Sequence, residues 1–337
     1  MGGRTHEQVG TDFAIEAVDL VKHYGDTVAV DGVSFEVPRG TVTGLLGPNG
    51  AGKTTVVRMM TTLTRATRGT ARVAGHDVRT EADAVRRSMG LTGQTATVDE
   101  LLTGAENLAL VGRLYGLDRA TVRRLTHDLL ERFSLGDAAK RVVKTYSGGM
   151  RRRLDLAVSL VATPPVLFLD EPTTGLDPRS RVELWDVLRG LVDDGTTLLL
   201  TTQYLEEADQ LADEIVVIDH GRVIAQGTPL ELKDSSGRAA LVVTVSRAGD
   251  LDRAHELLAR VVPEVHVDVG ARRLTSPAQG LDDVTAAVAA FSGSGIDLDD
   301  LGLQRPSLDD VFLHLTGRRA EQENDETALE AGEGDER

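Results

Sequence analysis

Residues 47–55 read GPNGAGKTT and combine the residue types and the spacing that hold phosphate. The glycines let backbone N–H groups turn inward, because no Cβ stands in their way. Lys53 supplies a positive charge for the β- and γ-phosphates of a nucleotide, and the Thr54 hydroxyl suits Mg²⁺. The candidate phosphate loop consists of Gly47, Pro48, Asn49, Gly50, Ala51, Gly52, Lys53, Thr54 and Thr55.

The segments around this loop fit the same chemistry. The apolar run VTGLL precedes the loop and the helical run VVRMMTTL follows it, which is the strand–loop–helix context that the motif requires. The N-terminus of such a helix carries about half a positive charge and points at the phosphates. A chance glycine-rich turn is the alternative, and this context disfavours it.

Two adjacent acids end the apolar run VLFLDEP at 166–172. Neighbouring residues of a strand point to opposite sides, so the two carboxylates have different roles. Asp170 suits the ligand shell of Mg²⁺, and Glu171 then faces the γ-phosphate and the attacking water as a general base. The alternative is that the pair ends a strand in solvent.

Two glutamines follow apolar strands. Gln94 precedes a helix-only stretch, and its long neutral amide is able to contact both Mg²⁺ and the water. Taken alone, Gln94 is better interpreted as a surface loop residue. Gln203 follows TTLLLTT directly before a helix, a place from which a side chain reaches the γ-phosphate. Capping of that helix is the alternative role of Gln203.

Three consecutive arginines occur in TYSGGMRRR at 145–153, in a chain whose net charge is −16. Consecutive helical residues are about 100° apart, so Arg151, Arg152 and Arg153 fan around a helix. We expect most of this triplet to be solvated. The spread of the arginines around the helix and the negative net charge both argue against nucleic-acid binding.

The functional part of that stretch is the sequence Ser147, Gly148 and Gly149. Bare amides and a hydroxyl at a helix N-terminus form a second anion site. The chain has one phosphate loop, so this second site has no triphosphate of its own. It is explained if it closes over the nucleotide of a second copy of the chain.

Length and composition limit the remaining possibilities. A chain of 337 residues, 41% hydrophobic and 27% charged, is expected to form about two soluble domains. Cysteine is absent, which excludes disulfides and thiolate metal sites. The start lacks the apolar core of a signal peptide, and the longest charge-free apolar run is too short to span a bilayer. We therefore expect that the chain does not cross a membrane by itself.

Short apolar runs alternate with helical patterns at 103–116, 119–134, 148–162 and 178–193. This alternation predicts a mostly parallel α/β sheet covered on both faces. Residues 239–304 then read strand, helix, strand, strand, helix, strand, which is typical of a small split βαβ domain. A helix with Ser307 and Asp310 as a capping box follows. The expected domains are a disordered N-terminus at 1–12, a nucleotide-binding domain at 13–236 with a helical lobe at about 95–162, a small α+β domain at 237–317 and a disordered acidic tail at 318–337.

These motifs together resemble the ATP-binding subunit of ABC transporters, from residue 13 to about 226. The resemblance implies a P-loop ABC ATPase core with an inserted helical lobe and a β-strand subdomain. It also assigns roles to several residues. By this resemblance, Tyr24 is the aromatic that stacks on adenine, and Gln94 lies in the glutamine loop that couples to the membrane subunit. YSGGM (146–150) is the signature, and 166–172 is the Mg²⁺ and catalytic strand. Gly175-Leu176-Asp177 is the dimer-contact loop.

The chain departs from the family pattern at two positions. Met150 replaces the signature glutamine, and Gln203 stands where the family usually has a switch histidine. Glutamine is able to hydrogen-bond the γ-phosphate, but it does not titrate near neutral pH. The sequence TTQY often occurs at this place in a narrower group, the daunorubicin/doxorubicin-resistance type of drug exporter. LDDVFLHLTGR (308–318) also resembles the tail motif of that group, although an ordinary amphipathic helix that packs Val311, Phe312 and Leu315 on its own domain explains it as well.

The resemblance implies ATP and Mg²⁺ as cofactors, a nucleotide-dependent homodimer and a separate integral membrane permease subunit. It places the chain at the cytoplasmic face of the membrane. Import and the export of lipid or polysaccharide are the alternatives within transport. Soluble ABC ATPases of translation or DNA repair are disfavoured, because the chain has no second ATPase half, no long coiled coil and no zinc cysteines.

Overall fold

The computed structural model describes residues 12–93, 97–235, 239–278 and 280–312. The chain forms two compact units, residues 1–228 and 229–337. The division between Thr228 and Pro229 lies before the boundary expected at 236.

The centre of the first unit is a six-stranded sheet in the order β10-β9-β3-β8-β7-β6. All its neighbouring strands pair in parallel except β9 and β10, which are antiparallel. Its strands are β3 (Val42–Leu46), β6 (Met89–Thr92), β7 (Val166–Asp170), β8 (Thr197–Thr202), β9 (Glu214–Asp219) and β10 (Arg222–Gly227). Every residue of β3, β7 and β8 is buried, as expected for a parallel sheet covered on both faces.

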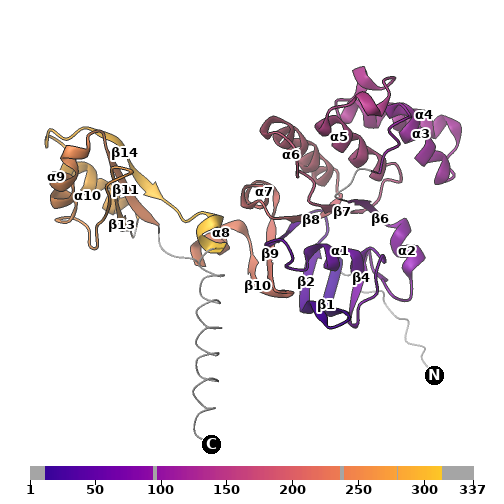
Figure 1. Cartoon of the computed structure of the whole chain (residues 1–337), viewed down its shortest axis with the longest axis horizontal. Helices are drawn as coiled ribbons and strands as arrows, with labels where there is room; N and C mark the ends of the chain where they lie inside the picture. The colour runs from indigo at the N-terminus through magenta and orange to yellow at the C-terminus, as the bar shows by residue number, and fades with distance from the viewer. Residues whose placement is uncertain (1–11, 94–96, 236–238, 279, 313–337) are drawn as a thin grey trace, which may run out of the picture. The chain divides into compact units, whose positions relative to one another are not determined.

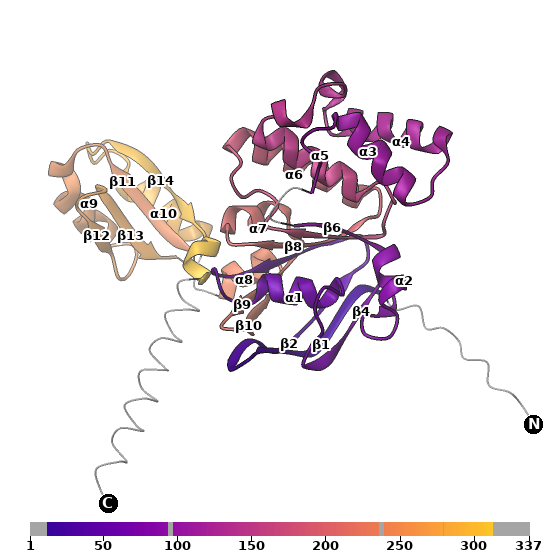
Figure 2. The ribbon, with the colours of Figure 1, turned by 45° about the vertical axis from the view of Figure 1, so that its right-hand side comes forward.

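Two layers cover this sheet (Figures 1 and 2). One contains α1 and a four-stranded antiparallel sheet in the order β2-β1-β4-β5, and the other contains α5, α6 and α7. The strands of the second sheet are β1 (Phe13–Tyr24), β2 (Thr27–Pro38), β4 (Arg68–Val73) and β5 (His76–Asp77). The helices of the unit are α1 (Lys53–Met60), α2 (Ala82–Arg87), α3 (Gly104–Leu114), α4 (Arg119–Arg132), α5 (Gly148–Ser159), α6 (Pro178–Asp193) and α7 (Leu205–Leu211).

Strand β7 shows how the sheet divides its side chains between the two layers. Val166 and Phe168 belong to the apolar cluster that contains α1, whereas Leu167 and Leu169 belong to the cluster of the helical lobe. This is the alternation of a strand buried on both faces. Asp170 continues the series of Val166 and Phe168, so it lies on the face of the sheet that α1 covers.

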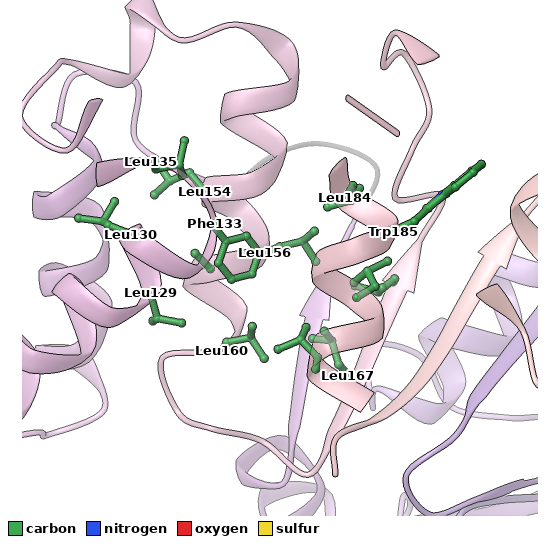
Figure 3. Packing of buried hydrophobic residues seen from close by; sticks show 14 of the residues in the cluster. Leu129, Leu130, Phe133, Leu135, Leu154, Leu156, Leu160, Leu167, Leu184 and Trp185 are labelled. Carbon is green, nitrogen blue, oxygen red and sulfur yellow. The ribbon is translucent and has the colours of Figure 1, made fainter. Parts of the chain in front are cut away.

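The helical lobe shares one packed core with α6 and the central sheet. Figure 3 shows Phe133 beside Leu156, within the cluster that also includes Leu154 and Leu184. The predicted helices are present, with ends up to three residues shorter than expected. Asp118 is the N-cap of α4 and accepts hydrogen bonds from the N–H groups of Ala120 and Thr121, and Pro178 lies in the first turn of α6.

Two apolar runs of the sequence, RVAGHDV at 72–78 and EIVVIDHGRVIA at 214–225, each fold into a hairpin. Residues 72–78 include a turn at Ala74 and Gly75, whose φ values are 50° and 83°. Residues 214–225 include a turn at His220 and Gly221, whose φ values are 45° and 77°. Two successive left-handed residues reverse the chain with the twist that hairpins prefer.

The second unit contains a four-stranded antiparallel sheet in the order β12-β13-β11-β14. Its element order matches the predicted strand, helix, strand, strand, helix, strand. The elements are α8 (Pro229–Ser235), β11 (Ala240–Val245), α9 (Leu251–Leu258), β12 (His266–Asp268), β13 (Arg273–Pro277), α10 (Leu281–Phe291) and β14 (Leu298–Gln304). Alternate residues of β11, namely Leu241, Val243 and Val245, pack against α9 and α10.

The predicted capping box follows in the same unit. Ser307 and Asp310 exchange backbone N–H to side-chain hydrogen bonds of 2.8 and 3.2 Å, and Val311 is buried. The rest of the predicted helix, from residue 313, lies outside the described residues. Among the described residues, no helix has the length and hydropathy that crossing a bilayer requires.

Candidate functional site

The phosphate loop joins β3 to α1 and depends on its glycines. A Cβ on Gly47 would lie 2.1 Å from the Ile218 carbonyl oxygen, and a Cβ on Gly52 would lie 2.5 Å from the Ala29 carbonyl oxygen. Gly52 also has a φ of 104°, which L side chains rarely adopt. The loop therefore packs its backbone where no side chain fits, directly before the N-terminus of α1.

Lys53 is buried at the start of α1. Its ammonium group donates hydrogen bonds to the carbonyl oxygens of Gly47 (2.7 Å) and Pro48 (2.9 Å). Burial lowers the pKa of this ammonium from its usual value, and the negative charges of Glu171 and Asp170 oppose that shift. The loop thus encloses a cation that two carboxylates face.

Asp170 joins three segments of the site. Its Oδ1 accepts hydrogen bonds from the hydroxyls of Thr54 (3.1 Å) and Thr201 (2.6 Å). The carboxylate therefore lies beside the first turn of α1, as its position on β7 implies. Sequence reasoning missed Thr201, since a threonine near the end of an apolar strand also reads as an ordinary strand former.

The Thr54 hydroxyl and the Asp170 carboxylate fit a magnesium ion. Mg²⁺ prefers hard oxygen ligands, and these two groups lie within hydrogen-bonding distance of each other next to the phosphate loop. The predicted third ligand, Gln94, lies outside the described residues.

Glu171 points away from the sheet ladder. It has a φ of 48°, in the left-handed region, and its backbone N–H is held by the carbonyl (3.1 Å) and hydroxyl (3.0 Å) oxygens of Thr201. Its carboxylate accepts a hydrogen bond from the Thr174 hydroxyl (3.2 Å). The two carboxylates therefore have different hydrogen-bond partners, Thr54 and Thr201 for Asp170 and Thr174 for Glu171.

A pocket of about 200 Å³ brings the predicted loop and Glu171 together. It is lined by Ala29, Asn49, Gly50, Ala51, Gly52, Lys53, Thr54, Thr55 and Glu171. The chemistry available there is binding of phosphate by backbone N–H groups and a cation, with a carboxylate opposite. Lys53, Thr54, Asp170 and Glu171 thus meet as the motif predicts.

Gln203 and Tyr24 lie outside the lining of this pocket. Gln203 follows the last residue of β8, two positions after Thr201. Helix α7 has Tyr204 at its N-cap and no side-chain hydrogen bond there, so Gln203 is not its cap. Tyr24 ends β1 and is 47% exposed, with the Lys22 ammonium 4.9 Å from its ring centre.

The second predicted anion site lies at the N-terminus of α5. Ser147 is the N-cap, and its hydroxyl accepts a hydrogen bond from the Met150 N–H (3.2 Å). Gly148 is exposed, and a Cβ there would meet nothing within 4 Å. This helix end is open to solvent, and its residues do not line the phosphate-loop pocket.

Asp177 of the predicted dimer-contact loop lies close to this helix end. Its carboxylate caps α6 by accepting hydrogen bonds from the Ser180 N–H (3.0 Å) and hydroxyl (2.7 Å), which hold the pKa of Asp177 below its usual value. A Cβ on Gly149 would lie 2.8 Å from the Ser180 hydroxyl oxygen. Gly149 of the signature therefore lies beside Ser180, the residue that donates to Asp177, within one chain.

The arginine triplet corrects one expectation. Arg151 pairs with Glu100 (3.2 Å) and Arg153 pairs with Glu183 (3.3 Å), but Arg152 is only 7% exposed. The prediction that most of the triplet is solvated is wrong for Arg152, because this side chain turns into the protein. The signal available in the sequence was Asp155, an acid one turn later on the same face.

Comparisons with known proteins agree with this geometry. The family model for "ABC transporter" matches residues 30–174. The chain is 53% identical to the daunorubicin/doxorubicin resistance ATP-binding protein DrrA of Streptomyces peucetius, over 94% of this chain and 96% of that protein. It is 49% identical to the doxorubicin resistance ATP-binding protein DrrA of Mycobacterium tuberculosis, over 90% and 94%, and 41% identical to the Nod factor export ATP-binding protein I of Ralstonia nicotianae, over 92% and 96%.

Solved structures share the fold of the first unit. One is an ATP-binding subunit of an ABC transporter, with a TM-score of 0.60 and 30% identity over 66% of this chain and 92% of that chain. Another is an ATP-binding cassette of an ABC transporter in its ADP conformation, with a TM-score of 0.61 and 26% identity over 66% and 93%.

Proposed function

The chain belongs to the ATP-binding subunits of ABC transporters, and from that premise we propose that it powers export of a drug-like hydrophobic compound through a separate membrane subunit. The observation that carries the cargo class is the 53% identity to a daunorubicin/doxorubicin resistance protein over nearly the whole of both chains. The 41% identity to a Nod factor export protein also favours export over import.

The nucleotide site has a residue for each task in hydrolysis. The backbone N–H groups of residues 49–55 and the Lys53 ammonium bind the phosphates. Thr54 and Asp170 would hold Mg²⁺, which would supply positive charge to the phosphates. Glu171 accepts the proton of the attacking water, and Gln203 orients that water and the γ-phosphate.

A second copy of the chain completes the site. The Ser147 helix end has an exposed Gly148 and does not line the chain's own pocket, which supports a role in binding the triphosphate of a partner copy. The proximity of Gly149 to Ser180, which donates to Asp177, supports a role for Asp177 at the same interface. Two such copies form a nucleotide-dependent homodimer with two composite sites.

The permease is a separate chain. The relatives are named as ATP-binding proteins, which supports a transport path formed by an integral membrane subunit on another chain. The ATP-binding subunit then lies at the cytoplasmic face, where ATP is present, with Gln94 as the coupling residue.

Transport by membrane vesicles tests this function. Inverted vesicles from cells that produce this chain together with its permease should accumulate daunorubicin when MgATP is added, and ADP should not support uptake. Vesicles that carry Lys53→Ala are the matched control, since that change removes the phosphate countercharge. Vigorous ATP hydrolysis without uptake of the drug would overturn the proposed cargo class.

A further inference from the structure

Arg152 on α5 holds the backbone that carries Glu171. Its Nε donates to the Pro172 carbonyl (2.8 Å), and its Nη2 donates to the carbonyls of Asp170 (3.2 Å) and Glu171 (3.2 Å). These are three consecutive carbonyl groups at the point where the chain leaves β7. One planar guanidinium, with its five fixed donors, therefore fastens the whole turn.

This turn needs an external support. Glu171 has a φ of 48°, and a non-glycine residue in the left-handed region persists only when its surroundings hold it there. Thr201 holds the N–H of Glu171 from β8, and Arg152 holds its carbonyl from α5. The direction of the Glu171 carboxylate thus depends on groups from two other elements.

Asp155 supports Arg152 from one turn further along α5. Its side chain is 1% exposed, and its Oδ2 lies 3.6 Å from Nη1 of Arg152. Oδ1 accepts two hydrogen bonds from Thr97, from the N–H (2.7 Å) and the hydroxyl (2.7 Å). Within the described part of the chain, Oδ2 has no hydrogen-bond partner, so Arg152 is the cation that balances this buried charge.

The pair also reaches the residues before and after Gln94. Arg152 donates to the Gly93 carbonyl through Nη1, while Asp155 accepts from Thr97. The backbone under Glu171 is therefore connected through two side chains of α5 to Gly93 and Thr97. Neither side chain lines the nucleotide pocket.

We propose that Arg152 and Asp155 form a positioning pair that fixes Glu171 for hydrolysis while leaving nucleotide affinity to the phosphate loop. This inference rests on the proposed role of Glu171 as general base. The competing explanation is a buried ion pair that only stabilises α5.

The test measures kcat, ATP affinity and melting temperature on the same variants of the full chain. Arg152→Gln should lower kcat by about 10²-fold, the order of effect that misplaced catalytic groups show, with ATP affinity within about threefold of the original. Arg152→Lys keeps the charge opposite Asp155 but not the fork of donors, so its kcat should recover only in part. Arg151→Gln is the matched control, because it removes a surface pair from the same helix and should leave kcat unchanged.

A double variant separates positioning from stability. If Arg152 acts through Glu171, then Arg152→Gln should slow hydrolysis no further in a chain that already carries Glu171→Gln. An unchanged kcat for both Arg152 variants would overturn the proposal. So would a parallel loss of kcat, ATP affinity and melting temperature, which indicates a structural role. Full turnover in the Glu171→Gln chain would instead contradict the proposed role of Glu171 as general base. That result differs from both outcomes above, which concern the Arg152 variants.

Discussion

The chain has two glycine-rich helix starts, and they differ in what surrounds them. The start of α1 contains a buried lysine, and Asp170 and Glu171 face it. The start of α5 has an exposed Gly148, and the arginines that follow are engaged with acids or carbonyl groups of their own chain. The first combines a cation with two carboxylates, whereas the second offers backbone N–H groups and the Ser147 hydroxyl. The proposed homodimer gives the second a role, because another chain then brings the phosphates.

The largest expected effect comes from a change of Glu171, which faces the N-terminus of α1. Glu171→Gln removes the general base but keeps a side chain of the same size, so turnover should fall by about 10³-fold while ATP still binds. Closed dimers should then accumulate in MgATP, since hydrolysis no longer separates them. Steady-state hydrolysis and size-exclusion chromatography measure the two effects.

Lys53→Ala is the control for this change. It should instead lose nucleotide affinity, because it removes the main countercharge to the phosphates. Near-normal hydrolysis by the Glu171→Gln chain would contradict the assignment of the base.

A change at the N-terminus of α5 tests whether this helix end binds the triphosphate of a partner copy. Gly148→Asp places a carboxylate where a Cβ meets nothing within 4 Å, so the fold of the chain should tolerate it. ATP binding by one chain should survive, while hydrolysis and ATP-driven dimerisation should fall by about 10²-fold, because the carboxylate repels the partner's triphosphate. Gly148→Ala, which is neutral and small, should keep activity.

Mixing two damaged chains sharpens the result. A dimer of one Gly148→Asp chain and one Lys53→Ala chain has one site with both lesions and one with neither. Partial recovery of hydrolysis on mixing is expected. Two affinity tags verify that mixed dimers form. If these dimers remain inactive although one intact site is enough for turnover, the result refutes a site shared between chains.

The same comparison explains what the sequence was able to predict. The phosphate loop was predictable because its nine residues are contiguous and the backbone itself does the binding. The meeting of Thr54 with Asp170 followed from strand alternation, since Asp170 shares a face with Val166 and Phe168.

Arg152 was not predictable in the same way. A run of three arginines reads as a solvated surface, because the desolvation cost of a buried guanidinium is large unless partners are present. Those partners are carbonyl groups about twenty positions away in the chain, at Asp170, Glu171 and Pro172. Only the packing of α5 against the end of β7 reveals them.

A smaller effect than that of Glu171→Gln is expected at Gln203, which directly follows β8. Gln203→Ala should lower kcat by about 10²-fold with little change in ATP affinity, the loss typical of a positioned transition-state donor. Gln203→His should keep activity and add a pH dependence between about 6 and 7, where imidazole titrates. Hydrolysis assays across that pH range measure the effect of Gln203→His. For Gln203→Ala, a lower melting temperature with unchanged kcat would refute the role of Gln203 in orienting the water and the γ-phosphate.

The smallest expected effect concerns Tyr24, which is expected to stack on the base of the nucleotide. Its ring is 47% exposed at the end of β1, which leaves a face free to stack on a purine. Stacking of a base on an aromatic ring contributes about 1–3 kcal/mol, so Tyr24→Ala should weaken ATP binding about tenfold. The same loss should appear for GTP, because both purines present a π-face. Tyr24→Phe keeps the ring and serves as the control, with an affinity close to that of the original chain. Equilibrium titration with a fluorescent nucleotide measures all three, and an unchanged affinity in Tyr24→Ala would mean that the ring serves only to pack against the Lys22 side chain, whose ammonium lies 4.9 Å from its centre.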